Sequence, residues 1–134
     1  MKVLFGTLIV CVVLFSVAMI GMRLRKARSI ETEVALTIEA DYRAFSSTQP
    51  PETLSSASRI VDILSMCLGP NSQTIYSSPE LNKKVAVARG LAISNLVTGL
   101  ETFSGMNYGT NIQAWENWLK TKSTDGAVKE GAVK

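Results

Sequence analysis

The sequence predicts an all-α protein with a single N-terminal transmembrane helix followed by a small helical domain. An uncharged apolar stretch opens the chain, and apolar residues recur at helical spacing in several later segments. With 134 residues, the chain has room for one membrane anchor and one domain of about 100 residues. Four regions are expected: an anchor with a basic collar (1–28), a juxtamembrane amphipathic helix (29–49), a helical domain (50–120) and a flexible tail (121–134).

The apolar stretch runs from Val3 to Met22 without a charged residue. About 20 residues at 1.5 Å each match a hydrocarbon core of about 30 Å. A cleaved signal peptide is the alternative, but its apolar region is usually about 7–15 residues long. It also ends at a small-x-small site before a polar mature start, and this chain has no convincing site of that kind. The stretch therefore predicts a membrane-spanning helix.

Positive charge follows the apolar stretch and indicates its orientation. The basic side chains are Arg23, Arg25, Lys26 and Arg28. The positive-inside rule then predicts a single-pass protein of the inner (plasma) membrane with its C-terminal domain in the cytoplasm. We expect the same side chains to contact lipid headgroups. Small residues would let neighbouring helices approach the anchor, and the predicted interface is Gly6, Ser16, Ala18 and Gly21.

The segment "FGTLIV" also resembles, in part, the start of type IV pilins and secretion pseudopilins. Those proteins have a short basic leader ending in glycine, then an aromatic residue, and a glutamate at the fifth position. Here Thr7 follows Gly6, and Val10 or Cys11 stands where the glutamate would be. A pilin-like filament subunit is therefore kept as an alternative.

The anchor is predicted to continue as one helix to about Phe45, because no glycine or proline interrupts the chain between Gly21 and Pro50. A rod of roughly 60 Å results. Its apolar stripe is Ile30, Val34, Ile38, Tyr42 and Phe45. The consecutive prolines 50 and 51 then break the helix.

The domain itself is predicted to contain three helices. The first spans residues 51–69, and the second begins at Pro79 after the N-cap Ser78 and ends near Phe103. The second carries two apolar stripes, so we expect it to be covered on more than one side: Leu81, Val85, Ala88, Ala92 and Leu96, beside Val87, Leu91, Ile93 and Val97. Thr110 and Gln113 stand at the spacing of a capping box before a short third helix.

Residues 77–122 resemble the last repeat of bacterial HEAT-repeat proteins. The resemblance is strongest in "GMNYGTNIQAWENW", which is similar to that family's G-x-N-Y-G loop and A-W-x-x-W helix; Asn111 replaces the family's aspartate, and the earlier helix matches weakly. The resemblance implies a HEAT-like helical hairpin that stacks on neighbouring helices and binds protein without catalysing a reaction.

Tyr108, Trp115 and Trp118 form the aromatic group of this motif. We expect the tryptophans to pack as a C-terminal lid over the preceding long helix, with a binding hot spot for a partner as the second interpretation. Stacking on nucleic-acid bases would need a basic groove that the sequence lacks. Glycines 105 and 109 are expected to serve turns.

Residues suited to catalysis are scarce. The chain has no histidine, which removes the commonest general base and metal ligand. Glu31, Glu33, Glu39 and Asp41 are interpreted as a solvated helix face, and Cys67 as a core thiol. No catalytic, cofactor or metal residue is predicted.

The expected function is a non-catalytic accessory or assembly subunit, with other membrane protein subunits and the lipid bilayer as partners and no nucleic acid. A pilin-like filament subunit and a membrane-tethered protein-binding module are the alternatives.

Overall fold

The computed structural model describes residues 2–130, and the side chains of residues 14–124 other than 71. The elements are α1 (Lys2–Ser46), α2 (Leu54–Leu68), the short 3₁₀ helix η1 (Pro70–Gln73), α3 (Pro79–Ser104) and α4 (Ile112–Glu130). No strand occurs within residues 2–130. The all-α prediction is therefore confirmed.

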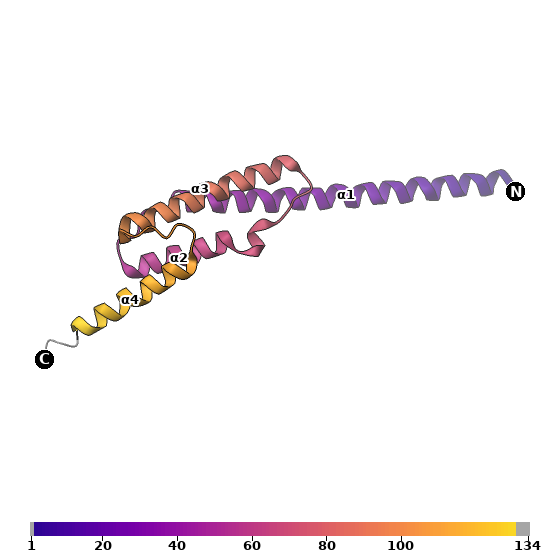
Figure 1. Cartoon of the computed structure of the whole chain (residues 1–134). Helices are drawn as coiled ribbons and strands as arrows, with labels where there is room; N and C mark the ends of the chain where they lie inside the picture. The colour runs from indigo at the N-terminus through magenta and orange to yellow at the C-terminus, as the bar shows by residue number, and fades with distance from the viewer. Residues whose placement is uncertain (1, 131–134) are drawn as a thin grey trace.

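Helix α1 is unbroken over 45 residues, or about 68 Å at 1.5 Å per residue. The predicted continuity to Phe45 is thus confirmed. Figure 1 shows that only its C-terminal half lies beside α3, while its N-terminal half extends beyond the other helices. The side chain of Asn95 on α3 donates hydrogen bonds to the carbonyls of Phe45 (3.4 Å) and Thr48 (2.9 Å), which ties the end of α1 to α3.

The face of α1 that meets the domain differs from the predicted stripe. Ile38 and Phe45 contact the core and Tyr42 is buried, but Ile30 and Val34 are 54% and 46% exposed. Ala35 is buried in their place. Only the small methyl group of alanine separates the two backbones there, so α1 and α3 approach closely along this face.

Helix α2 begins at a reciprocal cap. Thr53 accepts a hydrogen bond from the backbone of Ser56, and the Ser56 side chain accepts one from the backbone of Thr53. This pair satisfies two of the N–H groups that a helix start leaves without partners. The apolar face of α2 is buried between the other helices and consists of Ala57, Ile60, Val61, Leu64 and Cys67.

Helix α3 begins as predicted, with Ser78 as N-cap and Pro79 in the first turn, and ends at Gly105 in the left-handed conformation (φ 70°). The first predicted stripe is buried or nearly so. The second is only partly covered, because Val87 and Leu91 are 56% and 58% exposed. Helices α1 and α2 therefore cover α3 on one broad side, and its opposite side faces solvent.

Helix α4 continues to Glu130, so the structure places helix in the first part of the predicted flexible tail. The last four residues, 131–134, lie outside the description. α4 packs against α2, which corrects the prediction that this segment covers α3. Trp118 of α4 meets the Phe103 ring near the C-terminal end of α3, and α4 then runs along α2.

The predicted transmembrane helix is wrong for the part of the chain that the structure describes, in which no helix is long and apolar enough to cross a membrane. Within the described residues, α1 carries the charged side chains Arg23, Arg25, Lys26 and Arg28, which a hydrocarbon core would have to bury. The predicted single-pass location in the inner membrane, with a cytoplasmic domain, rested on that helix and is corrected with it.

Candidate interaction surfaces

Among the described side chains, a run of exposed apolar residues lies on α1 beyond the helical domain. We call residues 14–24 the projecting segment. Its large apolar side chains are between 38% and 69% exposed: Leu14, Phe15, Val17, Met19, Ile20, Met22 and Leu24. Single exposed apolar residues are ordinary, but a continuous apolar surface of this kind is typical of an interaction site.

The small residues predicted to seat a neighbouring helix lie largely in this segment. Ser16 and Ala18 are exposed and Gly21 is half-buried. A Cβ atom placed on Gly21 would meet nothing within 4 Å, so the chain itself leaves space there for another helix. The surroundings of Gly6 lie outside the described side chains. The predicted helix-packing interface therefore remains a prediction.

The basic cluster follows the projecting segment directly. Arg23, Arg25, Lys26 and Arg28 are all exposed on α1. The backbone carbonyl of Arg28 accepts a hydrogen bond from the Thr32 hydroxyl at 2.9 Å, and the Arg28 charge acts on the Glu31 carboxylate. The predicted contact of these side chains with lipid headgroups remains a prediction.

Glu31, which sequence analysis assigned to a solvated face, has a specific partner. Its carboxylate accepts hydrogen bonds from the backbone N–H of Ser77 and from the Ser77 hydroxyl, the latter at 2.6 Å. These two hydrogen bonds lower the pKa of Glu31, and the charge of Arg28 adds to the effect. Periodicity could not reveal this contact, because Ser77 belongs to a loop far along the chain.

The aromatic motif forms a packed cluster at the α3–α4 connection. Trp115 is fully buried, and its indole Nε1 donates a hydrogen bond to the carbonyl of Gly109 at 2.9 Å. The Tyr108 ring meets the Trp115 ring edge to face, with the two ring centroids 4.9 Å apart. Trp118 also meets Trp115 edge to face, with a centroid distance of 6.2 Å. Trp118 in turn meets Phe103 at the end of α3, with ring centroids 6.1 Å apart.

These contacts favour the core interpretation for Trp115, because a fully buried ring has no face left for a partner. Tyr108 and Trp118 are half-buried, so their outer edges remain available. The N-cap of α4 is Asn111, whose side chain accepts a hydrogen bond from Ala114 N–H at 3.1 Å. The predicted capping box of Thr110 and Gln113 is therefore wrong, because an Asn one residue later occupies the cap.

Groups that could support catalysis are dispersed. Across the described residues, no three His, Cys, Asp or Glu side chains gather as metal ligands would. Glu39 forms an ion pair with Arg43 on its own helix, at 2.8 Å. The Cys67 thiol is buried, and this burial raises its pKa, which opposes formation of the reactive thiolate.

No protein-family model matches the chain, and no curated protein or solved structure is significantly similar to it. The resemblance of residues 77–122 to a terminal HEAT repeat therefore remains a prediction, and function has to be argued from the surfaces themselves.

Proposed function

We propose that this protein is a non-catalytic assembly subunit that joins a larger protein complex through its projecting helix. The observation that carries the proposal is the projecting segment, in which seven large apolar side chains are exposed on a helix that the rest of the domain does not cover. Burying such side chains contributes roughly 1.5–3 kcal/mol each when they are fully covered. Contact with a complementary surface would therefore be strongly favourable.

The expected partner surface is one or more helices lying alongside α1. A helix offers its own apolar stripe and matches the straight shape of the projecting segment. Ser16, Ala18 and the open space at Gly21 would let such a helix approach closely. The exposed positive charges from Arg23 to Arg28 would then favour partners whose acidic side chains lie opposite them.

The helical domain supplies the second part of the proposed function. α1 is continuous from the projecting segment into the domain, so the domain is held in a defined position relative to whatever the projecting segment binds. The half-buried Tyr108 and Trp118 offer an aromatic edge for a further protein contact. This use agrees with the scaffold role that the HEAT-like resemblance implies.

The test is site-specific photocrosslinking in cells that express the full chain natively. A benzoylphenylalanine at Val17 should crosslink to one distinct protein, and native mass spectrometry should find that protein at a fixed ratio. The double variant Phe15→Ser/Ile20→Ser should abolish both results. Leu36→Ser is the matched control, because Leu36 is equally apolar and 50% exposed but lies outside the projecting segment. A monomer without crosslinks would refute the proposal.

A pilin-like filament subunit remains the second candidate. The continuity of α1 favours it, since one unbroken helix joins an apolar projecting half to a half packed within a domain. The same crosslinking experiment separates the two candidates. A filament subunit would crosslink only to copies of itself, and mass spectrometry would find its N-terminus shortened near Gly6.

A further inference from the structure

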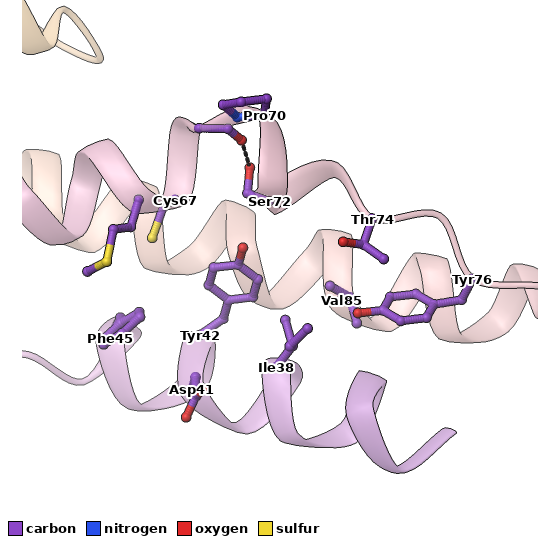
Figure 2. A pocket seen from close by; sticks show the side chains of 12 residues that line it. Ile38, Asp41, Tyr42, Phe45, Cys67, Pro70, Ser72, Thr74, Tyr76 and Val85 are labelled. Atoms are coloured by element: carbon purple, nitrogen blue, oxygen red, sulfur yellow. Dashed lines mark hydrogen bonds between the residues drawn. The ribbon is translucent and has the colours of Figure 1, made fainter. Parts of the chain in front are cut away.

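A cavity lies between α1, the end of α2, the loop that follows it and α3. Its volume is about 460 Å³, and it is partly open to solvent. Figure 2 shows Tyr42 rising from α1 between Ile38 and Phe45, with Cys67 on one side and Tyr76 on the other. The size is within the usual range of about 300–1,000 Å³ for small-molecule sites.

The walls of the cavity are mainly apolar. Ile38, Phe45 and Val85 line it together with the aromatic rings of Tyr42 and Tyr76. Asp41 stands at the exposed edge, and in Figure 2 its carboxylate points away from the cavity. A single water needs only about 10–15 Å³, so this space would hold many waters against apolar walls. Such water is poorly held and readily displaced by an apolar molecule.

The buried hydroxyl of Tyr76 supplies a polar contact. The Tyr76 side chain is 95% buried, as its 5% exposure shows, and its hydroxyl has no hydrogen-bond partner among the described residues. In Figure 2 that hydroxyl is directed toward Val85 and the cavity. A buried hydroxyl without a partner is destabilising, because it has lost its hydrogen bond to water and gained none in the protein. A ligand atom that accepts its hydrogen bond would remove this cost.

The charges around the cavity disfavour an anionic ligand. Burial raises the pKa of Tyr76 and the nearby Glu31 carboxylate adds to the effect, so the Tyr76 hydroxyl keeps its proton and acts as a donor. Arg89, whose charge acts on Tyr42 and Cys67 in the cavity wall, already donates hydrogen bonds to the carbonyl and hydroxyl of Ser72, at 3.0 and 3.2 Å. An uncharged ligand with an acceptor atom therefore fits both the walls and the donor.

We propose that this cavity binds a small, uncharged and largely apolar molecule with one hydrogen-bond acceptor, which the buried Tyr76 hydroxyl recognises. The apolar body of the ligand lies against Ile38, Phe45 and Val85, and its acceptor faces Tyr76. Because the cavity joins α1 to α2 and α3, the bound ligand adds contacts between the helix that projects and the helices that hold it. The site is separate from the projecting segment and does not depend on the proposed function.

The test uses prodan, a neutral dimethylaminonaphthalene with one ketone, whose fluorescence reports both polarity and hydrogen bonding to the ketone. Titration of the purified full chain should show saturable binding of one molecule per chain. Tyr76→Phe should weaken this binding about two- to tenfold, as expected for one hydrogen bond. Dimethylaminonaphthalene, which lacks the ketone, should bind wild type and Tyr76→Phe equally. Equal prodan binding to both proteins would overturn the proposed recognition.

Two further variants locate the probe. Ile38→Trp places a larger side chain in the cavity and should abolish prodan binding, whereas Leu14→Ser/Ile20→Ser should leave it unchanged. The reverse pattern would show that prodan binds the projecting segment and would overturn the proposal.

Circular dichroism and the urea midpoint of unfolding check that each variant is folded. Without ligand, Tyr76→Phe should unfold at the same or a higher urea concentration, because it removes an unpaired hydroxyl; a clearly lower midpoint would show that the hydroxyl already has a partner.

Discussion

The carboxylate of Glu31 on α1 holds Ser77, which lies 46 residues further along the chain just before α3. One oxygen accepts from the Ser77 backbone N–H and the other from its hydroxyl. The loop between η1 and α3 is thereby tied to the point where α1 leaves the domain. The same loop carries Tyr76, so this contact also sets one wall of the cavity.

Glu31→Gln is expected to reduce the dependence of stability on acidic pH. The pKa of Glu31 is lowered in the folded protein from its ordinary value of 4.5. Its contribution to stability is therefore complete above about pH 4.5, the unfolded pKa, and is lost as the pH falls through the folded pKa. The melting temperature of wild type should fall more steeply below that pH than that of Glu31→Gln.

Glu33→Gln is the matched control for this experiment. It removes the same charge from an exposed position on the same helix. Its melting temperature should follow that of wild type across the acidic range. If Glu31→Gln and Glu33→Gln gave the same pH profile, the contact between Glu31 and Ser77 would carry no stability.

Trp115→Phe is expected to destabilise the protein by about 1–3 kcal/mol, measured by urea unfolding. Phenylalanine keeps an aromatic ring but loses the donor to the Gly109 carbonyl and leaves part of a fully buried space empty. Trp118→Phe should cost clearly less, since Trp118 is half-buried and its indole donates no hydrogen bond to any residue that the structure describes. A larger loss for Trp118→Phe would mean that the outer ring, not Trp115, holds α4 in place.

Two glycine substitutions are expected to act in opposite directions. Gly105 ends α3 with a φ of 70°, where a side chain costs about 1–2 kcal/mol, so Gly105→Ala should lower the urea midpoint. Gly90 lies within α3, where a Cβ atom would meet nothing within 4 Å. Gly90→Ala should raise the midpoint, with a gain of about 0.5–1 kcal/mol in stability. If both substitutions moved the urea midpoint in the same direction, the assigned roles of Gly105 and Gly90 in α3 would be wrong.

Local patterns predicted the helices well where a cap or a breaker marked their ends. Ser78 and Pro79 start α3, and the absence of glycine and proline after Gly21 gave α1 its unbroken course through Phe45. The side of α1 that faces the domain was predicted less well. Ile30 and Val34 share the helical spacing of Tyr42 yet stay exposed, because the domain meets the neighbouring face of α1, which carries Glu31 and Ala35. Periodicity does not report which of two adjacent faces a neighbouring segment covers.

For the candidate sites too, the sequence predicted residue types but not contacts between distant segments. The apolar character of the projecting segment and the aromatic motif around Trp115 could be read from residue types alone. The cavity could not, because its walls come from α1, α2, α3 and the loop between them. Nor could the packing of α4 on α2, since the motif that suggested a lid over α3 records only which residues are apolar.

The sequence by itself determined that this protein is helical, where most helices begin and end, and which residue types its surfaces offer, because capping, backbone restriction and apolar spacing act over a few neighbouring residues. Only the tertiary structure decided which apolar residues are buried, that Glu31 binds Ser77, and that Tyr76 has a buried hydroxyl facing a cavity. These properties depend on contacts between distant segments, which arise only when the helices pack together.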